Sequence, residues 1–190
     1  THPLIMKLRE LGIVLLNEID IAWEIKQQIA PEQKWLAITG TNGKTSTVEL
    51  AESILKMAGI KALACGNVGT PVIDAVTSDE KYDYLVLELS SFQLHWADSA
   101  EFVASAILNI APDHIDWHGS MQEYAQAKLD LLSRSVTAIL NGDDETVVGG
   151  SAHWQGRKIF YTLQTPKPGE LGVVEDLLVD RAFVPDPLEA

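Results

Sequence analysis

Residues 35–47 read Trp-Leu-Ala-Ile-Thr-Gly-Thr-Asn-Gly-Lys-Thr-Ser-Thr. The apolar run 35–38 predicts a buried strand, and an apolar-periodic segment that predicts a helix begins at Val48. A glycine turn followed by Lys44 and Thr45, placed between a strand and a helix, is the order of a phosphate-binding loop. The stretch therefore predicts both the fold class and the place of a site.

The residue types of this loop suit a polyphosphate. Glycines let backbone N–H groups approach phosphate oxygens, and the start of a helix adds positive potential. Lys44 can reach the terminal phosphates and the Thr45 hydroxyl can ligate Mg²⁺. The usual pattern is Gly-x-x-x-x-Gly-Lys-Ser/Thr, but Ile38 stands five before Gly43, so this loop is a shortened form. The alternative is an ordinary glycine turn with an exposed lysine, which the flanking strand and helix disfavour.

Composition narrows the class of protein. The chain has 190 residues, 46% of them hydrophobic, which is enough for one full-sized domain with a sizeable core. A net charge of −13 argues against binding nucleic acid through bulk electrostatics. Cys65 is the only cysteine, so a disulfide within the chain is impossible and a reducing compartment is natural. Because no apolar run spans a membrane and no signal peptide opens the chain, we expect a cytoplasmic protein without a membrane partner.

From Trp35 onward the sequence alternates between predicted strands and predicted helices. We expect strands at 35–39, 61–65, 84–88, 103–108, 137–140 and 158–161, and helices at 45–58, 70–77, 91–98, 120–133 and 143–149. Near-continuous apolar strands, such as 84–87, are typical of parallel sheets covered by helices on both faces. We therefore predict an α/β, three-layer domain with a mostly parallel sheet, and a small edge hairpin at 172–179.

The first 33 residues have a different pattern. We expect a helix from Pro3 to Leu11, a short strand from Ile13 to Leu16 and a helix from Ile19 to Ile29. One strand and two helices are too few to bury a core of their own. Residues 30–34, Ala-Pro-Glu-Gln-Lys, have the composition of a boundary. We therefore predict that 1–33 is the tail of a preceding domain and that 34–190 is a central domain.

Three more loops place polar residues directly after predicted strands. They are Gly66-Asn-Val-Gly69, Glu88-Leu-Ser-Ser-Phe-Gln93 and Asn109-Ile-Ala-Pro-Asp-His-Ile-Asp116. Because ligands of open α/β sheets bind at the carboxyl ends of the strands, we expect these loops to converge on the phosphate-binding loop. Glu88 ends a very apolar strand, where a carboxylate is costly unless it is paired or bound to a metal. With Thr45 it suits Mg²⁺, and the alternative is a capping or ion-paired glutamate.

Two single residues are further candidates. His114 lies in a turn marked by Pro112 and could ligate a metal or touch a substrate, or it could be a structural histidine. Lys128 lies on the apolar face of its predicted helix, four residues after Tyr124 and four before Leu132. Burial lowers the pKa of a lysine and leaves a neutral amine that can be modified or used in catalysis. The alternative, that its head reaches solvent along the rim of the sheet, is equally open.

Together these motifs resemble the Mur ligase family, the ATP-dependent amide-forming enzymes of peptidoglycan precursor synthesis. Residues 39–45, Thr-Gly-Thr-Asn-Gly-Lys-Thr, are similar to the shortened phosphate-binding loop of that family. The other motifs are similar to its D-glutamate-adding branch, and Ser-Ser-Phe-Gln at 90–93 is the main reason for that choice. The resemblance spans about residues 12 to 180. Trp117 and Asn17 stand where relatives are expected to have Arg and Gly, which leaves substrate-side details open.

The resemblance implies a role for each matching residue. The phosphates of ATP would be held by Gly40, Thr41, Asn42, Gly43, Lys44, Thr45 and Ser46. Thr45 and Glu88 would hold one Mg²⁺, and His114 would ligate a second Mg²⁺ or contact the substrate. Lys128 matches a lysine that CO₂ carbamylates, and its carbamate would help bind the second Mg²⁺. The substrate would be contacted by Asn67, Ser90, Gln93 and His114. The expected catalytic residues are Lys44, His114 and Lys128.

The resemblance also implies a reaction. The carboxylate of UDP-N-acetylmuramoyl-L-alanine attacks the γ-phosphate of ATP to form an acyl phosphate, and the amine of D-glutamate then displaces phosphate. The family binds the uridine nucleotide on an N-terminal domain, whose tail would be 1–33, and the amino acid on a C-terminal domain that we expect to be absent. Because the site for the amino acid would be missing, we expect this chain to be inactive alone. We also expect it to be a monomer. The alternatives are another Mur-type or folylpolyglutamate-type ligase, or a P-loop nucleotide-binding module without ligase chemistry.

Overall fold

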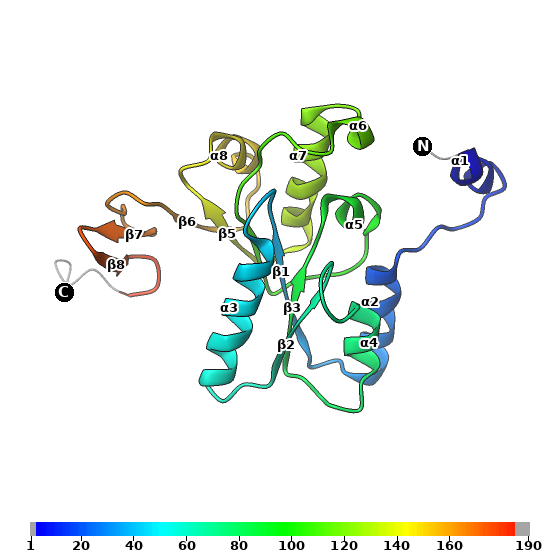
Figure 1. The fold of residues 1–190 in the computed structure, drawn as a ribbon, viewed down its shortest axis with the longest axis horizontal. Helices are drawn as coiled ribbons and strands as arrows, with labels where there is room; N and C mark the ends of the chain where they lie inside the picture. Colours follow the sequence, from blue (N-terminus) through cyan, green and yellow to red (C-terminus); the bar gives the residue numbers. More distant parts are fainter. Residues whose placement is uncertain (1–2, 185–190) are drawn as a thin grey trace.

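The protein is built on one eight-stranded sheet in the order β2-β3-β1-β4-β5-β6-β7-β8 (Figure 1). The computed structural model describes residues 3–184; residues 1–2 and 185–190, at the outer ends of the two predicted domains, lie outside it. The strands are β1 (Lys34–Thr39), β2 (Ala62–Gly66), β3 (Tyr84–Glu88), β4 (Ala104–Ile107), β5 (Thr137–Asn141), β6 (Arg157–Tyr161), β7 (Leu171–Val174) and β8 (Leu177–Asp180). Neighbouring strands from β2 to β7 pair in parallel, and β7 pairs with β8 antiparallel, which confirms the mostly parallel sheet and its edge hairpin.

The helices follow the predicted ones within a few residues, except for the short helix at Ile115–His118, which the sequence did not predict. They are α1 (Pro3–Glu10), α2 (Glu18–Ile29), α3 (Lys44–Met57), α4 (Val72–Thr77), α5 (Ser91–Trp96), α6 (Ile115–His118), α7 (Met121–Leu129) and α8 (Glu145–Ser151), with a 3₁₀ helix η1 (Asp130–Arg134). The single helix predicted for 120–133 is therefore α7 followed by the tighter turns of η1, a common end for an α-helix. Within residues 3–184, four helices begin after residues whose side chains accept a hydrogen bond from a first-turn amide: Asn17, Ser90, Ser120 and Asp144.

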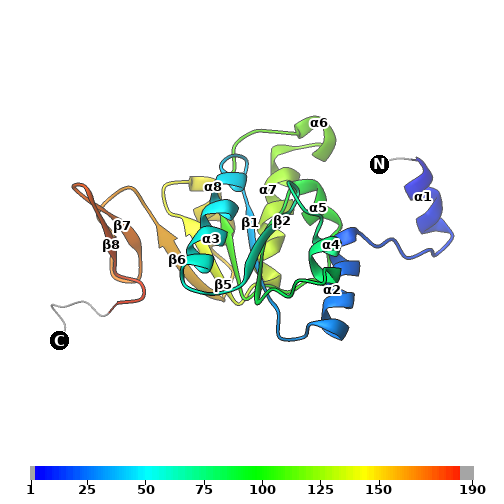
Figure 2. The ribbon, with the colours of Figure 1, turned by 60° about the horizontal axis from the view of Figure 1, so that its bottom comes forward.

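Alternate residues of the central strands bury opposite faces of the sheet. Trp35 and Ala37 of β1 pack in a core with α2, α4 and α5, and α7 and α8 close a second core against β4 and β5 on the same face. Ile38 packs against Val48 of α3 on the other face. Figure 2 shows α3 separated from α2 and α4 by the sheet. The three predicted layers are present, and Cys65 is buried in the first of these cores.

The predicted strand at 13–16 is wrong. These residues form an irregular link between α1 and α2, and Ile13, Val14 and Leu16 are all exposed. An apolar β-branched run favours a strand only where a neighbouring strand can pair with it, and this segment has none within the described part of the chain. In Figures 1 and 2, α1 stands away from the rest of the protein at the end of this link.

Helix α2 packs closely with the sheet domain. Ile19 and Ala22 are fully buried in the core that contains Trp35, and the Glu18 carboxylate accepts a hydrogen bond from the Ile73 amide at 2.8 Å. Packing therefore joins α2 to the sheet domain, although the division at residue 33 remains a prediction about the domains of a longer protein. Among residues 3–184, no helix combines the length and apolar character needed to cross a membrane.

Candidate functional site

The loop between β1 and α3 is shaped by two glycines. Gly43 adopts a φ of 83°, which favours glycine, and caps the start of α3. At Gly40 an added Cβ would lie 3.0 Å from the Cβ of Leu108, so a side chain would meet the end of β4. The first-turn amides of α3, residues 44–46, have no partner within the helix, and the cap residue offers them no side-chain acceptor. Such a helix start is a ready anion site.

Two lysines meet at one carbonyl of this loop. The Nζ of Lys44 donates to Gly40 O at 3.0 Å and to Thr41 O at 3.1 Å. The Nζ of Lys128 also donates to Gly40 O at 3.0 Å, although it comes from α7. The sequence placed Lys128 on the apolar face of its helix, and the structure shows that its amine reaches the phosphate-binding loop.

Lys128 does not reach solvent along the rim of the sheet. Its side chain is 2% exposed, and its Nζ lies 4.8 Å from the ring centre of Tyr124. Burial, followed by the positive charge of Lys44, lowers the pKa of Lys128 from 10.5 to about 8, while Asp113 opposes the shift. A substantial fraction of this amine is therefore neutral at mildly alkaline pH, which is the form that reacts with an electrophile.

Glu88 is buried at the end of β3 and is fully engaged. Its Oε2 accepts a hydrogen bond from the Thr45 hydroxyl at 2.8 Å, and its Oε1 accepts one from Asn67 Nδ2 at 3.0 Å. Gly66 lets β2 approach the backbone at the end of β3, because an added Cβ there would clash with Glu88 O. The strand-end carboxylate predicted from the sequence thus lies beside the predicted hydroxyl ligand.

Most of the predicted residues line one small pocket. It has a volume of about 150 Å³ and is lined by Gly40, Thr41, Lys44, Asn67, Ser90, Ser91, Phe92, Asp113, His114, Tyr124 and Lys128. These residues come from the loops after β1, β2, β3 and β4, from the first turns of α3 and α5, and from α7, and the four loops meet as the convergence of strand ends predicts. A larger hollow of about 770 Å³ shares none of these residues, so we place the site in the smaller pocket, where the cationic and hydroxyl groups meet.

Ser90 and Gln93 bond to each other. The side-chain oxygen of Gln93, Oε1, accepts from the backbone N–H of Ser90 at 3.0 Å and from the Ser90 hydroxyl at 2.9 Å. In return, Ser90 Oγ accepts from the backbone N–H of Gln93. This capping box starts α5. Ser90 lines the pocket, whereas Gln93 does not, so the structure gives Gln93 a role in shaping the loop.

His114 is held in an unusual backbone conformation at the pocket edge. Its φ is 49°, its ring lies 4.8 Å from that of Phe92, and its Nε2 lies 3.5 Å from a carboxylate oxygen of Asp113. The side chain is 47% exposed, so it can reach a ligand in the pocket. Left-handed backbone in a residue other than glycine is uncommon and often marks a functional position.

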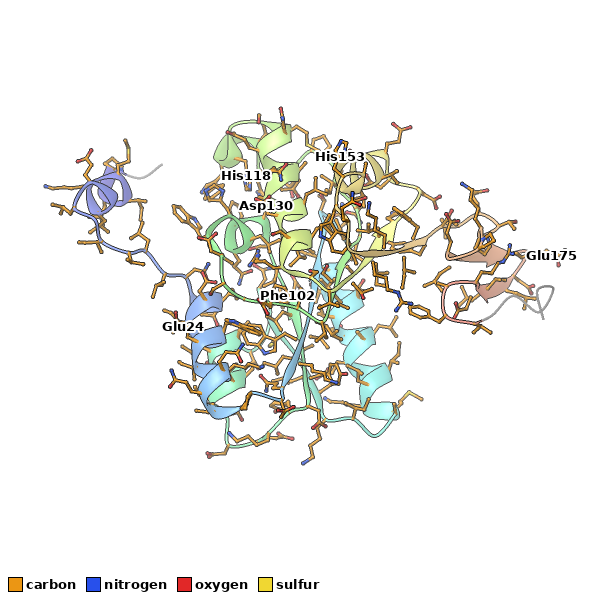
Figure 3. All side chains as sticks on the ribbon, turned by 180° about the vertical axis from the view of Figure 1, so that it is seen from behind. Glu24, Phe102, His118, Asp130, His153 and Glu175 are labelled. Atoms are coloured by element: carbon orange, nitrogen blue, oxygen red, sulfur yellow. The ribbon has the colours of Figure 1, made fainter. Side chains whose placement is uncertain are left out.

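Three residues that sequence analysis gave no role also shape the site. The Tyr124 hydroxyl lies 2.9 Å from Thr41 Oγ1, so this core residue of α7 also contacts the loop. The amide of Asn109 bonds to the backbone of Asn42. His118, labelled in Figure 3, is buried and its Nε2 lies 2.9 Å from Ser91 Oγ. Burial, followed by the charge of His95, lowers the pKa of His118.

The oxygen donors of the site fit a hard cation that is also held by phosphate. Within residues 3–184, no group of three or more His, Cys, Asp or Glu could hold a metal. Thr45 Oγ1 and the Glu88 carboxylate nevertheless lie side by side at the start of α3. One carboxylate and one hydroxyl, completed by phosphate and water, form a donor set that Mg²⁺ accepts.

Comparison with known proteins gives one family. Residues 38–176 match the model of the Mur ligase middle domain. The chain is 46% identical to the UDP-N-acetylmuramoylalanine–D-glutamate ligase of Streptomyces coelicolor and 45% identical to that of Thermobifida fusca. These matches cover 98% and 97% of this chain but only 41% and 40% of the relatives, so the chain spans about two fifths of their length.

Solved structures agree on the fold. A MurF ligase from Thermotoga maritima in complex with ADP has a TM-score of 0.63 over 80% of this chain and 39% of its own, at 19% identity. The FolC protein of E. coli in complex with DHPP and ADP has a TM-score of 0.58 over 92% of this chain and 54% of its own, at 17% identity. At these identities the likeness concerns the fold alone.

Proposed function

Because this chain belongs to the Mur ligase family, we propose that it forms the ATP-binding part of a ligase that joins D-glutamate to UDP-N-acetylmuramoyl-L-alanine. The reaction would pass through an acyl phosphate, and the enzyme would act as a cytoplasmic monomer. The proposal rests mainly on one observation: the amines of Lys44 and Lys128 both donate to Gly40 O in one pocket. Asn67, which also lines this pocket, bonds to the Glu88 carboxylate. The D-glutamate specificity rests on the named relatives.

Lys44 and the first turn of α3 would bind the phosphates of ATP. Lys44 already points across the loop, where two carbonyls hold its ammonium. A phosphate oxygen is a stronger acceptor than a carbonyl, so the side chain would turn to the ligand with little reorganisation. The same positive charges would offset repulsion between the attacking carboxylate and the γ-phosphate, which is the main electrostatic demand of phosphoryl transfer.

Thr45 and Glu88 would hold one Mg²⁺, which supplies charge neutralisation between the phosphates. The hydrogen bond between Thr45 and Glu88 keeps both oxygens in place before any cation binds. Asn67 restrains the second carboxylate oxygen, so Glu88 cannot rotate away from the loop. Asn67 would also contact the muramoyl substrate, together with Ser90 and His114 at the pocket edge; Gln93 would contribute by fixing Ser90.

Lys128 would react with CO₂ as a neutral amine, and its carbamate with His114 would offer ligands to a second Mg²⁺. Burial and the lowered pKa support this part of the proposal, because carbamylation requires the neutral form. The modification exchanges a buried cation for an anion near Lys44, so the two groups would attract. Mass spectrometry of protein trapped with and without bicarbonate would detect the modification directly.

Phosphate release from MgATP tests the ligase assignment. We would assay this chain and a version extended to the length of its relatives, each with UDP-N-acetylmuramoyl-L-alanine, with and without D-glutamate. Release by the extended protein only with both substrates is the expected result. Lys44→Ala should abolish MgATP binding, whereas Lys56→Ala, which removes a surface lysine of α3 paired with Glu52, should not.

The outcomes separate the alternatives. Lys44-dependent MgATP binding without substrate-dependent release would overturn the substrate assignment and leave a nucleotide-binding module. Release with another acceptor or amino acid would indicate a different ligase of the same family.

A further inference from the structure

Asn109, the first residue after β4 whose side chain meets the phosphate-binding loop, bonds to it with both ends of its amide. The Asn42 amide donates to Asn109 Oδ1 at 2.8 Å, and Asn109 Nδ2 donates to Asn42 O at 3.0 Å. The Thr41 amide donates to Asn109 O at 2.9 Å. One residue thus satisfies three backbone groups of a loop that lies 67 positions away.

The side-chain amide of Asn109 bonds to Asn42 in the way that a backbone peptide group would. Two residues that exchange both N–H···O bonds form the closed pair seen between antiparallel strands, and the Asn109 amide forms such a pair with Asn42. The loop has two residues between its glycines where the usual pattern has four. A shorter loop has fewer backbone groups with which to stabilise itself.

The bonds to Asn109 also decide which amides remain for a ligand. The amides of Thr41 and Asn42 are both occupied by Asn109. The amides of the first turn of α3 have no intrahelical partner and stay available. We propose that Asn109 is a positioning residue, whose side chain replaces a missing peptide unit of the shortened loop and so directs phosphate to the first turn of α3.

The rest of the loop after β4 reinforces this contact. The Ala111 amide donates to Thr41 Oγ1 at 3.0 Å, so the chain on both sides of Ile110 is fixed to the phosphate-binding loop. The same segment continues to His114 at the pocket edge. Loss of the Asn109 amide would therefore loosen one wall of the pocket while the hydrophobic core stays intact.

Asn141 provides a matched control at the end of the adjacent strand β5. Its Nδ2 donates to Leu108 O at 2.9 Å and its Oδ1 accepts from the Asp143 amide at 2.9 Å. Both asparagines are half-buried, and each makes one bond as donor and one as acceptor to backbone. The bonds of Asn141 go to segments outside the phosphate-binding loop. Asn141→Ala should therefore lower stability as Asn109→Ala does, but it should leave the backbone amides that would bind phosphate unchanged.

The test measures MgATP affinity by calorimetry and stability by thermal unfolding in wild type, Asn109→Ala and Asn141→Ala. Because the inference rests on the proposed nucleotide site, Lys44→Ala is included. We expect Asn109→Ala to raise Kd at least tenfold and Asn141→Ala less than threefold, with similar falls in Tm. Hydrogen exchange should show faster exchange of the Asn42 amide in Asn109→Ala alone.

The possible failures are distinguishable. If wild type binds MgATP through Lys44 and Asn109→Ala binds within threefold of it, the inference is wrong and the proposed function stands. Equal losses of affinity in the two asparagine variants would also overturn it, because the effect would then be general loosening. If wild type shows no Lys44-dependent binding, the proposed function and this inference fall together.

Discussion

Replacing Lys128 with methionine should remove a defined part of the pH dependence of stability. Lys128 is 2% exposed, and burial is the main reason that its pKa falls from 10.5 to about 8. Methionine is similar in length, carries no charge and adapts to irregular space in a core. The substitution therefore removes the titrating group while it keeps most of the packing against Tyr124.

The sign follows from proton binding in the two states. Between pH 8 and pH 10.5 the unfolded chain holds a proton at Lys128 that the folded chain has lost, so stability rises with pH across this window. Below pH 8 both states are protonated and the folded state carries the whole cost of the buried charge. A difference of about 2.5 pKa units corresponds to roughly 3 kcal/mol.

Urea unfolding of wild type and Lys128→Met from pH 7.5 to 10.5, in buffer free of CO₂, measures this effect. The unfolding free energy of wild type relative to the variant should rise by about 3 kcal/mol over the range, and other titrations cancel in the difference. Lys44→Gln should raise the pKa of Lys128 and shrink the rise, because Lys44 is a second cause of the shift. Parallel profiles for wild type and Lys128→Met would refute the reasoning.

Three further outcomes are expected. Gly66→Ala should destabilise the protein by about 3 kcal/mol, because Gly66 has a φ of 115° and the new Cβ would meet Glu88 O. Gly59→Ala should cost only about 1–2 kcal/mol, because Gly59 has a φ of 78° but open space around it. Equal losses of Tm in the two variants would contradict this difference. The thiol of Cys65, 1% exposed and with its pKa raised to about 12 by burial, should react with a disulfide reagent only after unfolding, as absorbance of the released thiolate would report. Asp144→Ala should cost about 2–3 kcal/mol in urea unfolding, because its carboxylate accepts from two amides of α8 and one of the loop after β4; a change under about 0.5 kcal/mol would exclude this role.

Local pattern was sufficient for the sheet and for the phosphate-binding loop. The central strands β1 to β4 are short, largely apolar and followed by turns, so their places could be predicted without knowing their neighbours. Glu88 stood out because a carboxylate at the end of an apolar strand needs a partner, and the structure supplies Thr45. Helical spacing placed Lys128 on the apolar face of its helix, but it left open whether the amine is buried and did not predict its bond to Gly40 O.

The contacts that sequence reasoning missed join residues far apart in the chain. Asn109 meets Asn42 across 67 positions, and Tyr124 meets Thr41 across 83. No spacing rule links such positions, because the contact depends on which strands lie next to each other in the sheet. The false strand at 13–16 has the same origin, since β-structure depends on a partner that a local pattern cannot supply.

The central place of β1 has a consequence for how the protein folds during its synthesis. β1 pairs with β3 on one side and β4 on the other, and both come later in the chain. Residue 39 therefore leaves the ribosome about 45 residues before residue 84, which at typical elongation rates is roughly 2 to 9 seconds. During that interval the apolar residues of β1 lack both strands that pair with them, so a nascent chain arrested before β3 should be sensitive to protease and should bind chaperones at 35–38.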